Sequence, residues 1–492
     1  MSNSILKLFT DDEITRIHHA TLDLMENIGV KFSFEEAKHI FQDHGLRVSA
    51  SDVVYFPPHI VEAAIRSAPR RFTRYPLCPD AEPIKVGDGK FYVSPGSTPL
   101  WVLDLHTGER RKARLRDVED FAKLGDGLAN LALGNGVVQP LDIPETVVHA
   151  LWQQAVMKNT AKPAPAYNAL EKDVAEEVVE LVSIVCGGEE ELARKKTYAF
   201  TACPNSALFW GRAVVSFTEG AKRGMPLEIM PMPFCGSTHP VSLAGTLVQM
   251  NAEILSIVVL SQFIRRGTPV IYAPYGGIMD MKSATHSLGC PEAALLAAAA
   301  AQIARFYELP CDAIAGTSDS KVPDAQAAYE KMMCMLLPAM AGVDTVTLAA
   351  GLIDFAALAS FEQLVIDDEI TANIKRILEG VDLTEDKLAI DVIAEVGHGG
   401  NYLAHEHTLK YFREEHFIPD LTDRRLRGSW EEEGAKDILE RAREKAKHIL
   451  AEHKPTHMDE DTAKELDKAV LGICKRRGVQ YQKLPDRNKK GS

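Results

Sequence analysis

Short apolar runs alternate with longer amphipathic stretches through the middle of the chain, from residue 91 to residue 379. The runs are bounded by Gly and Pro, as buried strands are, and the longer stretches repeat their apolar positions with the period of a helix. We therefore predict eight strand-then-helix units. The strands are predicted at residues 91–94, 133–139, 163–167, 197–203, 227–232, 269–273, 312–315 and 345–349, and the helices at residues 115–128, 145–158, 172–186, 208–223, 241–265, 291–307, 324–340 and 361–379.

Regular alternation of strands and helices predicts a parallel sheet with right-handed crossovers. Eight units is the number that closes a TIM (β/α)8 barrel, so the predicted fold class is α/β of this kind. An open, doubly wound sheet is the alternative. It lacks support from motifs, because no GxGxxG follows a first strand and no Walker A sequence occurs.

The two ends of the chain are patterned differently from the middle. Residues 1–89 are predicted to form a helical N-terminal extension, with Ser33 as a helix N-cap. Residues 90–380 form the predicted barrel, which includes a hairpin near residues 106–108. Residues 381–492 form a predicted helical C-terminal extension, in which residues 430–453 make a strongly charged amphipathic helix.

Composition narrows the class of protein. The 492 residues are 46% hydrophobic and 25% charged, as in an ordinary globular protein. A formal net charge of -14 argues against a nucleic-acid or anionic membrane partner. The longest apolar stretch is taken to be residues 293–304, shorter than the roughly 20 residues of a bilayer span. With no signal-peptide pattern and eight cysteines without a CxxC, we expect a cytoplasmic protein with reduced thiols.

The fifth predicted loop concentrates chemically useful side chains. Residues 227–245 read LEIMPMPFCGSTHPVSLAG, a short strand followed by a loop and the first turn of a helix. In a barrel the functional groups lie on the loops that follow the strands. Phe234 and His239 stand in this loop, and Tyr275 stands in the next one. An ordinary turn with incidental polar residues is the alternative for the fifth loop alone.

Aromatic rings are frequent near the predicted strand ends. A few rings converging with a carboxylate would bind a quaternary ammonium ion by cation–π attraction. Phe234 and Tyr275 are the favoured rings because each lies in a loop, whereas core packing is the alternative for any one ring. The rings near this end are Tyr92, Trp101, Tyr167, Phe209, Trp210, Phe234, Tyr272, Tyr275 and Phe355.

Polar candidates come from the sixth and seventh loops. Asp319 and Lys321, in residues 316–321, suit contact with a polar substrate, although they could instead cap and pair near the next helix. His286 is a further candidate, with a hydrogen-bonded loop histidine as the alternative. We predict no metal site, because no HxH, HxxxH or CxxC falls at a strand end.

Four stretches, taken in order, resemble the trimethylamine methyltransferase superfamily of corrinoid-dependent enzymes. They are residues 27–72, residues 231–255 with PMPFCGSTHPVSLAG, residues 319–330 with DSKVPDAQAAYE, and residues 405–424 with HEHTLKYFREEHFIPDLTDR. The resemblance implies a TIM barrel that passes a methyl group from a methylated amine to the cob(I)alamin of a separate corrinoid protein. Cobalamin is then carried by the cognate corrinoid partner, and no cofactor is bound tightly by this chain.

The resemblance also bears on the substrate. Members that demethylate trimethylamine carry a pyrrolysine in the barrel, and this sequence contains only standard residues. It is similar to members that act on quaternary amines, with glycine betaine as the first expectation. A quaternary nitrogen leaves as a neutral amine, so positioning of the methyl carbon is the main requirement.

On this hypothesis Phe234 and Tyr275 face the ammonium, while His239, His286 or Lys321 receives a substrate carboxylate. No catalytic residue is assigned, and a homo-oligomer is expected. A noncatalytic betaine-binding barrel and a zinc-dependent corrinoid methyltransferase are the alternatives.

Overall fold

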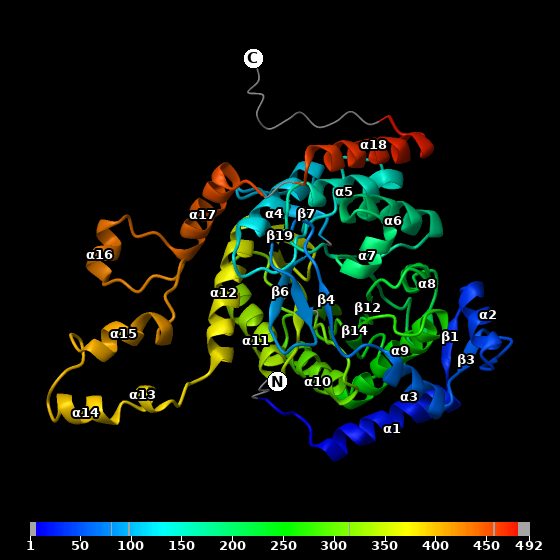
Figure 1. The fold of residues 1–492 in the computed structure, drawn as a ribbon, viewed down its shortest axis with the longest axis horizontal. Coiled ribbons are helices and arrows are strands. Elements are labelled where there is room, and N and C mark those ends of the chain that lie inside the picture. Colours follow the sequence, from blue (N-terminus) through cyan, green and yellow to red (C-terminus); the bar gives the residue numbers. More distant parts are fainter. Residues whose placement is uncertain (1–5, 80, 97–98, 314, 456–457, 481–492) are drawn as a thin grey trace.

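The computed structural model describes residues 6–79, 81–96, 99–313, 315–455 and 458–480. Short strands lie at the centre of the main body and helices surround them (Figure 1). The central strands are β6 (Tyr92–Pro95), β9 (Ala166–Tyr167), β10 (Ala199–Ala202), β12 (Leu227–Ile229), β14 (Val270–Tyr272) and β17 (Thr345–Ala350). The order β9, β10, β12, β14 and the pair β17–β6 are parallel throughout.

The other two predicted strands, at residues 133–139 and 312–315, do not form regular strands, and only isolated bridges occur in or next to them. Parallel bridges join Val93 to Leu131, Tyr272 to Cys311 and Asp312 to Thr345. One residue of the predicted strand 312–315, at position 314, lies outside the described residues.

The prediction of a strand at residues 133–139 is wrong. Val137 has a φ of 56°, and its backbone N–H donates to the side chain of Asn135 at 3.2 Å. This local hydrogen bond replaces ladder pairing. The Gly134 N–H nevertheless donates to the Pro163 carbonyl at 3.0 Å, so the segment stays beside its neighbour.

Helices cover the strands at each predicted position. They are α4 (Leu115–Gly127), the 3-10 turn η1 (Glu145–Val147), α5 (Val148–Met157), α6 (Lys172–Cys186), α7 (Glu189–Lys195), α8 (Val214–Lys222), α9 (Leu243–Ile264), α10 (Pro291–Phe306), α11 (Ala325–Ala341) and α12 (Phe361–Glu379). The helix predicted from residue 208 begins later, because β11 (Phe209–Trp210) pairs with a strand of the N-terminal extension. The fold is therefore α/β with parallel central strands.

Helix α9 corrects the prediction about the longest apolar stretch. This helix has 22 residues. Among the described residues, it is the one helix that is long and apolar enough to cross a membrane. Most of that apolar window, 72%, is buried inside the fold. Burial on nearly all sides explains the composition without a bilayer.

The N-terminal extension is mixed rather than helical. It contains α1 (Asp11–Asn27), α2 (Glu35–Asp43) and α3 (Pro58–Ser67), together with β1 (Val30–Phe32), β2 (Arg47–Val48), β3 (Val53–Tyr55), β4 (Phe72–Arg74) and β5 (Ile84–Val86). Strand β1 pairs with β11 in parallel, and α1 packs along α9. The extension was predicted as helical because its strands are too short to show an alternating pattern.

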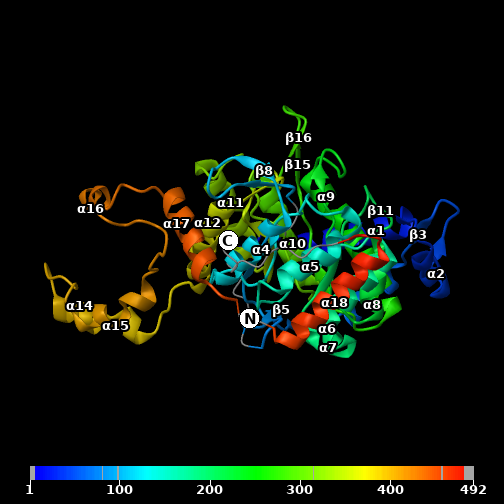
Figure 2. The same cartoon turned by 90° about the horizontal axis from the view of Figure 1, so that it is seen from above.

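Small hairpins stand at the ends of the central strands. β7 (Trp101–Leu103) and β8 (Arg110–Lys112) form the predicted hairpin. β15 (Gly277–Asp280) pairs with β16 (Thr285–Ser287) and with β13 (Phe234–Cys235). β18 (Leu352–Ile353) pairs with β19 (Leu358–Ser360), which joins β7. The β15–β16 hairpin projects from the body (Figure 2).

The C-terminal extension is helical, as predicted. It consists of α13 (Glu385–Leu388), α14 (Ile390–Val396), α15 (Glu406–Glu415), α16 (Arg427–Glu432), α17 (Ile438–Glu452) and α18 (Glu460–Arg476). α17 packs on α12 and α4, and α18 packs on α5 and α6. The helices α13 to α16 instead project sideways from the body (Figures 1 and 2).

Candidate functional site

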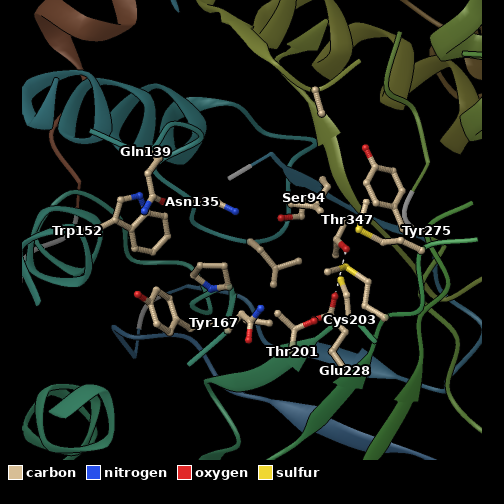
Figure 3. Close-up of a pocket in the computed structure, with 18 of the residues that line it drawn as sticks. Ser94, Asn135, Gln139, Trp152, Tyr167, Thr201, Cys203, Glu228, Tyr275 and Thr347 are labelled. Atoms are coloured by element: carbon tan, nitrogen blue, oxygen red, sulfur yellow. Dashed lines mark hydrogen bonds between the residues drawn. The ribbon is translucent and has the colours of Figure 1, made fainter. Parts of the chain in front are cut away.

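A cavity of about 460 Å³ opens among the carboxyl ends of the central strands (Figure 3). Four aromatic side chains line it: Trp152, Tyr167, Tyr275 and Phe355. In Figure 3 Trp152 and Tyr167 stand on one side of the cavity and Tyr275 on the other. Pockets at the carboxyl ends of parallel strands are the usual ligand sites of α/β folds.

The aromatic side chains are held by hydrogen bonds and by burial. The Trp152 indole Nε1 donates to the Val138 carbonyl at 2.9 Å, and the Tyr275 hydroxyl lies 3.3 Å from the Thr317 hydroxyl. Burial raises the pKa of Tyr167 and of Tyr275 well above its usual value. Both phenols are therefore neutral at neutral pH, and their rings can face a cation.

A carboxylate lies deeper in the cavity. Glu228 of β12 is 5% exposed and lines the cavity with Thr347 of β17. The Thr347 hydroxyl lies 2.6 Å from the Asp312 carboxylate and 3.4 Å from the Glu228 carboxylate. Two carboxyl groups and a hydroxyl thus meet beneath the aromatic rings.

Ionisation of one of these two buried carboxyl groups opposes ionisation of the other. Burial raises the pKa of Asp312 far above its usual value, and the neighbouring Glu228 charge raises it further. Burial also raises the pKa of Glu228, but the Arg74 guanidinium opposes that rise. Like charges this close cannot both ionise easily, and the Arg74 guanidinium favours the charged form of Glu228 over that of Asp312.

Arg74 supplies the positive charge at the same depth. It is 3% exposed and lines the cavity, and one terminal nitrogen donates to the carbonyls of Ala164 and Thr197. Its Nε is buried without a hydrogen-bond partner among the described residues. A buried donor without a partner is costly.

Of the six site residues predicted from the sequence, one lines the cavity, two lie beside its wall and three lie away from it. Tyr275 lines the cavity. Phe234 and His286 stack on one another, with ring centroids 3.9 Å apart and planes at 15°. Their rings lie 5.9 and 5.8 Å from that of Phe355, so they form a layer beside the cavity wall.

The remaining three predicted residues do not line the cavity. His239 is buried, and its Nε2 lies 3.3 Å from a carboxylate oxygen of Glu253 on α9. Asp319 accepts hydrogen bonds from the Ser287 hydroxyl and from the backbone N–H groups of residues 288 and 289, which joins the sixth and seventh loops. The Lys321 side chain is 73% exposed, with its Nζ 3.8 Å from Asp354.

Sequence reasoning missed the charged residues of the cavity. Glu228 had a signal, because it is the one charged residue in the apolar strand LEIMP. Arg74 had none, since it comes from the N-terminal extension and reaches the cavity only in the folded chain. Trp152 was hidden in an apolar helix pattern.

Within the described ranges, no three His, Cys, Asp or Glu side chains are grouped so that they could hold a metal ion. The cysteines at positions 203, 235, 290 and 311 are free thiols. Burial raises the pKa of the Cys203 thiol, whose sulfur faces the cavity, to about 12.

Fold and cavity together define an α/β protein with a small-molecule site, in which rings and a buried carboxylate favour an organic cation. The solved monomethylamine methyltransferase of Methanosarcina barkeri has a similar fold, with a TM-score of 0.51 over 97% of this chain and 90% of that chain. Its sequence is 11% identical, so this likeness concerns the fold alone.

The family model described as trimethylamine methyltransferase (MTTB) matches residues 2–477, and the chain belongs to this methyltransferase family. A glycine betaine methyltransferase of Desulfitobacterium hafniense is 34% identical over 96% of this chain and 97% of that protein. A trimethylamine methyltransferase of Methanosarcina barkeri is 34% identical over 95% of this chain and 97% of that protein. The family predicted from the sequence is confirmed, as is the prediction of a methyltransferase.

Proposed function

We propose that this chain transfers a methyl group from a quaternary amine, with glycine betaine as the first candidate, to the cob(I)alamin of a partner corrinoid protein. The observation that carries the proposal is the cavity in which aromatic rings stand over the Glu228 carboxylate. A similar protein that is named glycine betaine methyltransferase supports the choice of substrate. We also propose a cytoplasmic location, with neither a nucleic acid nor a membrane as partner.

The scaffold of this site is proposed to be a closed (β/α)8 barrel formed by residues 90–380. Parallel pairing, an isolated bridge or a backbone hydrogen bond joins each of the eight segments to the next, and β17 returns to β6. Residues 1–89 and 381–492 are the two extensions. In such a barrel the cavity lies at the end where binding sites occur.

Opposite charges inside the cavity suit a zwitterion. The ammonium group of a betaine would sit among the rings and near Glu228, with at least one methyl group directed at the open end. Its carboxylate would accept from Arg74, whose Nε is otherwise unpaired. In this arrangement Arg74 takes the role that the sequence suggested for His239, His286 or Lys321.

The main contribution of the protein to methyl transfer is to position the substrate. Cobalt(I) of the docked corrinoid supplies the nucleophile, and the amine leaves in its neutral form, so neither a general acid nor a metal on this chain is required. The rings fix the quaternary nitrogen, and Met230 and Met232 add apolar lining that excludes water. Holding the methyl carbon in line with an incoming nucleophile lowers the entropic barrier to transfer.

The open end of the cavity also suits a protein partner. Six exposed aliphatic side chains lie on loops between a central strand and the next helix, and we call them the rim. The rim residues are Leu100, Leu141, Leu170, Val241, Met281 and Val322, between 44% and 73% exposed. Apolar side chains gathered at one end of a fold mark an interaction site, and this one surrounds the cavity that the corrinoid must reach.

Methyl transfer to a reduced corrinoid protein tests the proposal. The purified chain is mixed with the corrinoid protein and each of a panel of betaines and methylamines, and methylcobalamin absorption is followed. We expect turnover with a quaternary amine, a KM about tenfold higher in Tyr275→Leu, and a nearly unchanged KM in Tyr275→Phe, since the ring is kept. If none of the amines methylates the corrinoid, the proposal is wrong.

The two alternatives predict different results in the same experiment. A noncatalytic betaine-binding barrel would bind the amine by calorimetry and form no methylcobalamin. A zinc-dependent enzyme would lose activity on chelation and regain it with added zinc. Phe234→Ala and His286→Ala belong in the panel, because a larger effect there than in Tyr275→Leu would move the ammonium site to that stacked pair.

A further inference from the structure

The helices α13 to α15 form an arm, residues 381–418, that leaves the body after α12 and lies to one side of it (Figures 1 and 2). No residue of these three helices, all of which the structure describes, is buried. The arm nevertheless carries large aliphatic side chains. They are Val381, Leu383, Leu388, Ile390, Ile393, Leu403, Leu409 and Ile418, between 43% and 83% exposed.

Polar contacts give the arm its shape. The Lys387 ammonium contacts three carboxylates, those of Asp382 at 3.1 Å, Glu414 at 2.5 Å and Glu415 at 2.8 Å. The Tyr411 hydroxyl donates to Asp386 at 3.0 Å, which also ties α13 to α15. These polar contacts join α13 to α15, while the aliphatic side chains of the arm stay exposed and form no core of their own.

The arm begins directly after α12, and hydrogen bonds at its C-terminal end tie it back to the same helix. The Arg376 guanidinium of α12 donates to the Glu415 carbonyl at 2.8 Å. The buried carboxylate of Glu369 accepts the backbone N–H groups of residues 420, 421 and 422. The arm is thus held out from the body rather than left as a free linker.

We infer that the arm packs on a second copy of this chain and that its aliphatic side chains form a permanent interface between subunits. An interface of standard size uses roughly 20–30 residues on each side, and residues 381–418 are long enough to supply one. In a symmetric dimer the exchange is reciprocal, so each chain covers the arm of the other.

A second copy fits this surface better than the corrinoid protein does. A corrinoid protein, which the proposed function requires, must leave after each methyl transfer, and exchanging partners use smaller and more polar contacts. An arm rich in Leu and Ile needs a cover that is always present. The arm lies to one side of the body (Figure 2). The rim residues lie instead on the loops after the central strands, so a partner bound to the arm leaves the proposed docking site free.

Sedimentation equilibrium on the full chain, without amine or corrinoid protein, tests the inference independently of the methyl-transfer assay. Wild type should sediment at a multiple of the chain mass of 54.1 kDa at micromolar concentration. The pair Ile390→Glu and Leu409→Glu places charges at two positions that are 67% and 65% exposed. Burying those charges should raise the subunit dissociation constant by about 100-fold or more.

The matched control is Ile28→Glu with Leu471→Glu, at positions 62% and 52% exposed and outside the arm. It should sediment like wild type. A monomeric wild type, or an arm variant as oligomeric as the control, overturns the inference. So does an arm variant that keeps its oligomeric state but loses methyl transfer, because the arm would then bind the corrinoid protein.

Hydrogen exchange keeps the inference testable if the arm variant fails to fold. In wild type the amides of α14 and α15 should exchange several-fold faster when the protein is diluted below its dissociation constant, while those of α9 should not change. Equal exchange at high and low concentration overturns the inference.

Discussion

At the scale of single residues, the cavity is distinguished by charged side chains whose burial costs free energy. Glu228, Asp312 and Arg74 are each below 6% exposed, and together they place a negative and a positive charge beneath neutral rings. Paired burial of this kind contributes little stability and is retained where the charges serve a ligand.

Replacing Glu228 tests the negative charge directly. Glu228→Gln keeps the acceptor for Thr347 and removes the charge, so the KM for the quaternary amine should rise about tenfold, equivalent to about 1.4 kcal/mol. The kcat should change less, since the charge acts on binding. Steady-state methyl transfer measures both quantities, with the exposed Glu176→Gln of α6 as the control; an unchanged KM would exclude Glu228 from cation binding.

Lys162 makes a prediction about pH. Its ammonium donates to the carbonyls of Gly125 and Leu128, both at 2.7 Å, and burial lowers its pKa to about 8. Because the folded pKa is lower than the unfolded value of 10.5, the unfolded chain binds more protons between pH 8 and 10.5, and the stability contribution of Lys162 rises with pH there.

The stability of wild type relative to Lys162→Met should therefore increase by about 3 kcal/mol from pH 8 to pH 10.5. Urea unfolding at several pH values measures the difference. Lys172→Met, at an exposed position of α6, should give a flat difference over the same range. If the stability difference between wild type and Lys162→Met also stays constant with pH, the pKa of Lys162 is not lowered in the folded state.

At the scale of elements, the N-terminal extension packs on α9 through α1 and α3. The Asn251 amide of α9 donates to the Thr21 hydroxyl at 3.0 Å and the Tyr307 hydroxyl at 2.7 Å, and accepts from the Tyr272 hydroxyl at 3.2 Å. One side chain of α9 therefore connects this helix to α1, to β14 and to the residue that follows α10. A fully satisfied buried network of this kind fixes how helices pack.

Asn251→Ala should lower the free energy of unfolding by about 2 kcal/mol, because it removes three buried hydrogen bonds and leaves the Tyr272 hydroxyl without its acceptor. The amides of α1 should also exchange faster, since α1 loses its polar contact with α9. Denaturant unfolding and hydrogen exchange measure the two effects, and the exposed Asn401→Ala serves as the control. Loss of stability with unchanged exchange in α1 would show that the network does not hold the extension.

At the scale of the whole molecule, two exposed apolar surfaces, the rim around the cavity and the arm at the side, are proposed to bind different partners. Within the rim, Val241 and Met281 are the most exposed side chains, at 73% and 66%. They come from different loops but approach each other next to Gly236. This pair is the most accessible part of the proposed corrinoid-docking surface.

Val241→Glu with Met281→Glu should weaken docking of the corrinoid protein about 30-fold, or about 2 kcal/mol. Amine binding should stay the same, because neither residue lines the cavity. Methyl-transfer rates at increasing corrinoid concentration, with amine binding by calorimetry, separate the two effects. Leu471→Glu on α18 is the control, and equal rates in variant and wild type would place docking elsewhere.

The sequence predicted more of the fold than of the site. Long runs of apolar positions located the helices of the main body, because these helices bury one face, as α6 does, or nearly all faces, as α9 does. Several short strands were also found between their Gly and Pro boundaries. The segment at residues 133–139 was not, since the positive φ of Val137 comes from a local bond to Asn135 that no periodic pattern shows.

The sequence by itself determined the family, most of the order of strands and helices in the main body, and Tyr275 as a favoured ring of the site, because local patterns and motifs lie within continuous stretches. It also placed Tyr167 and Phe355 near the strand ends, and both line the cavity. Tertiary structure alone decided that Arg74, Trp152 and Glu228 meet, since they come from three distant segments. It also turned His239 toward Glu253 and away from the cavity. Which polar side chains converge depends on how the strands pair and the helices pack, and that three-dimensional arrangement is not recorded in spacing along the chain.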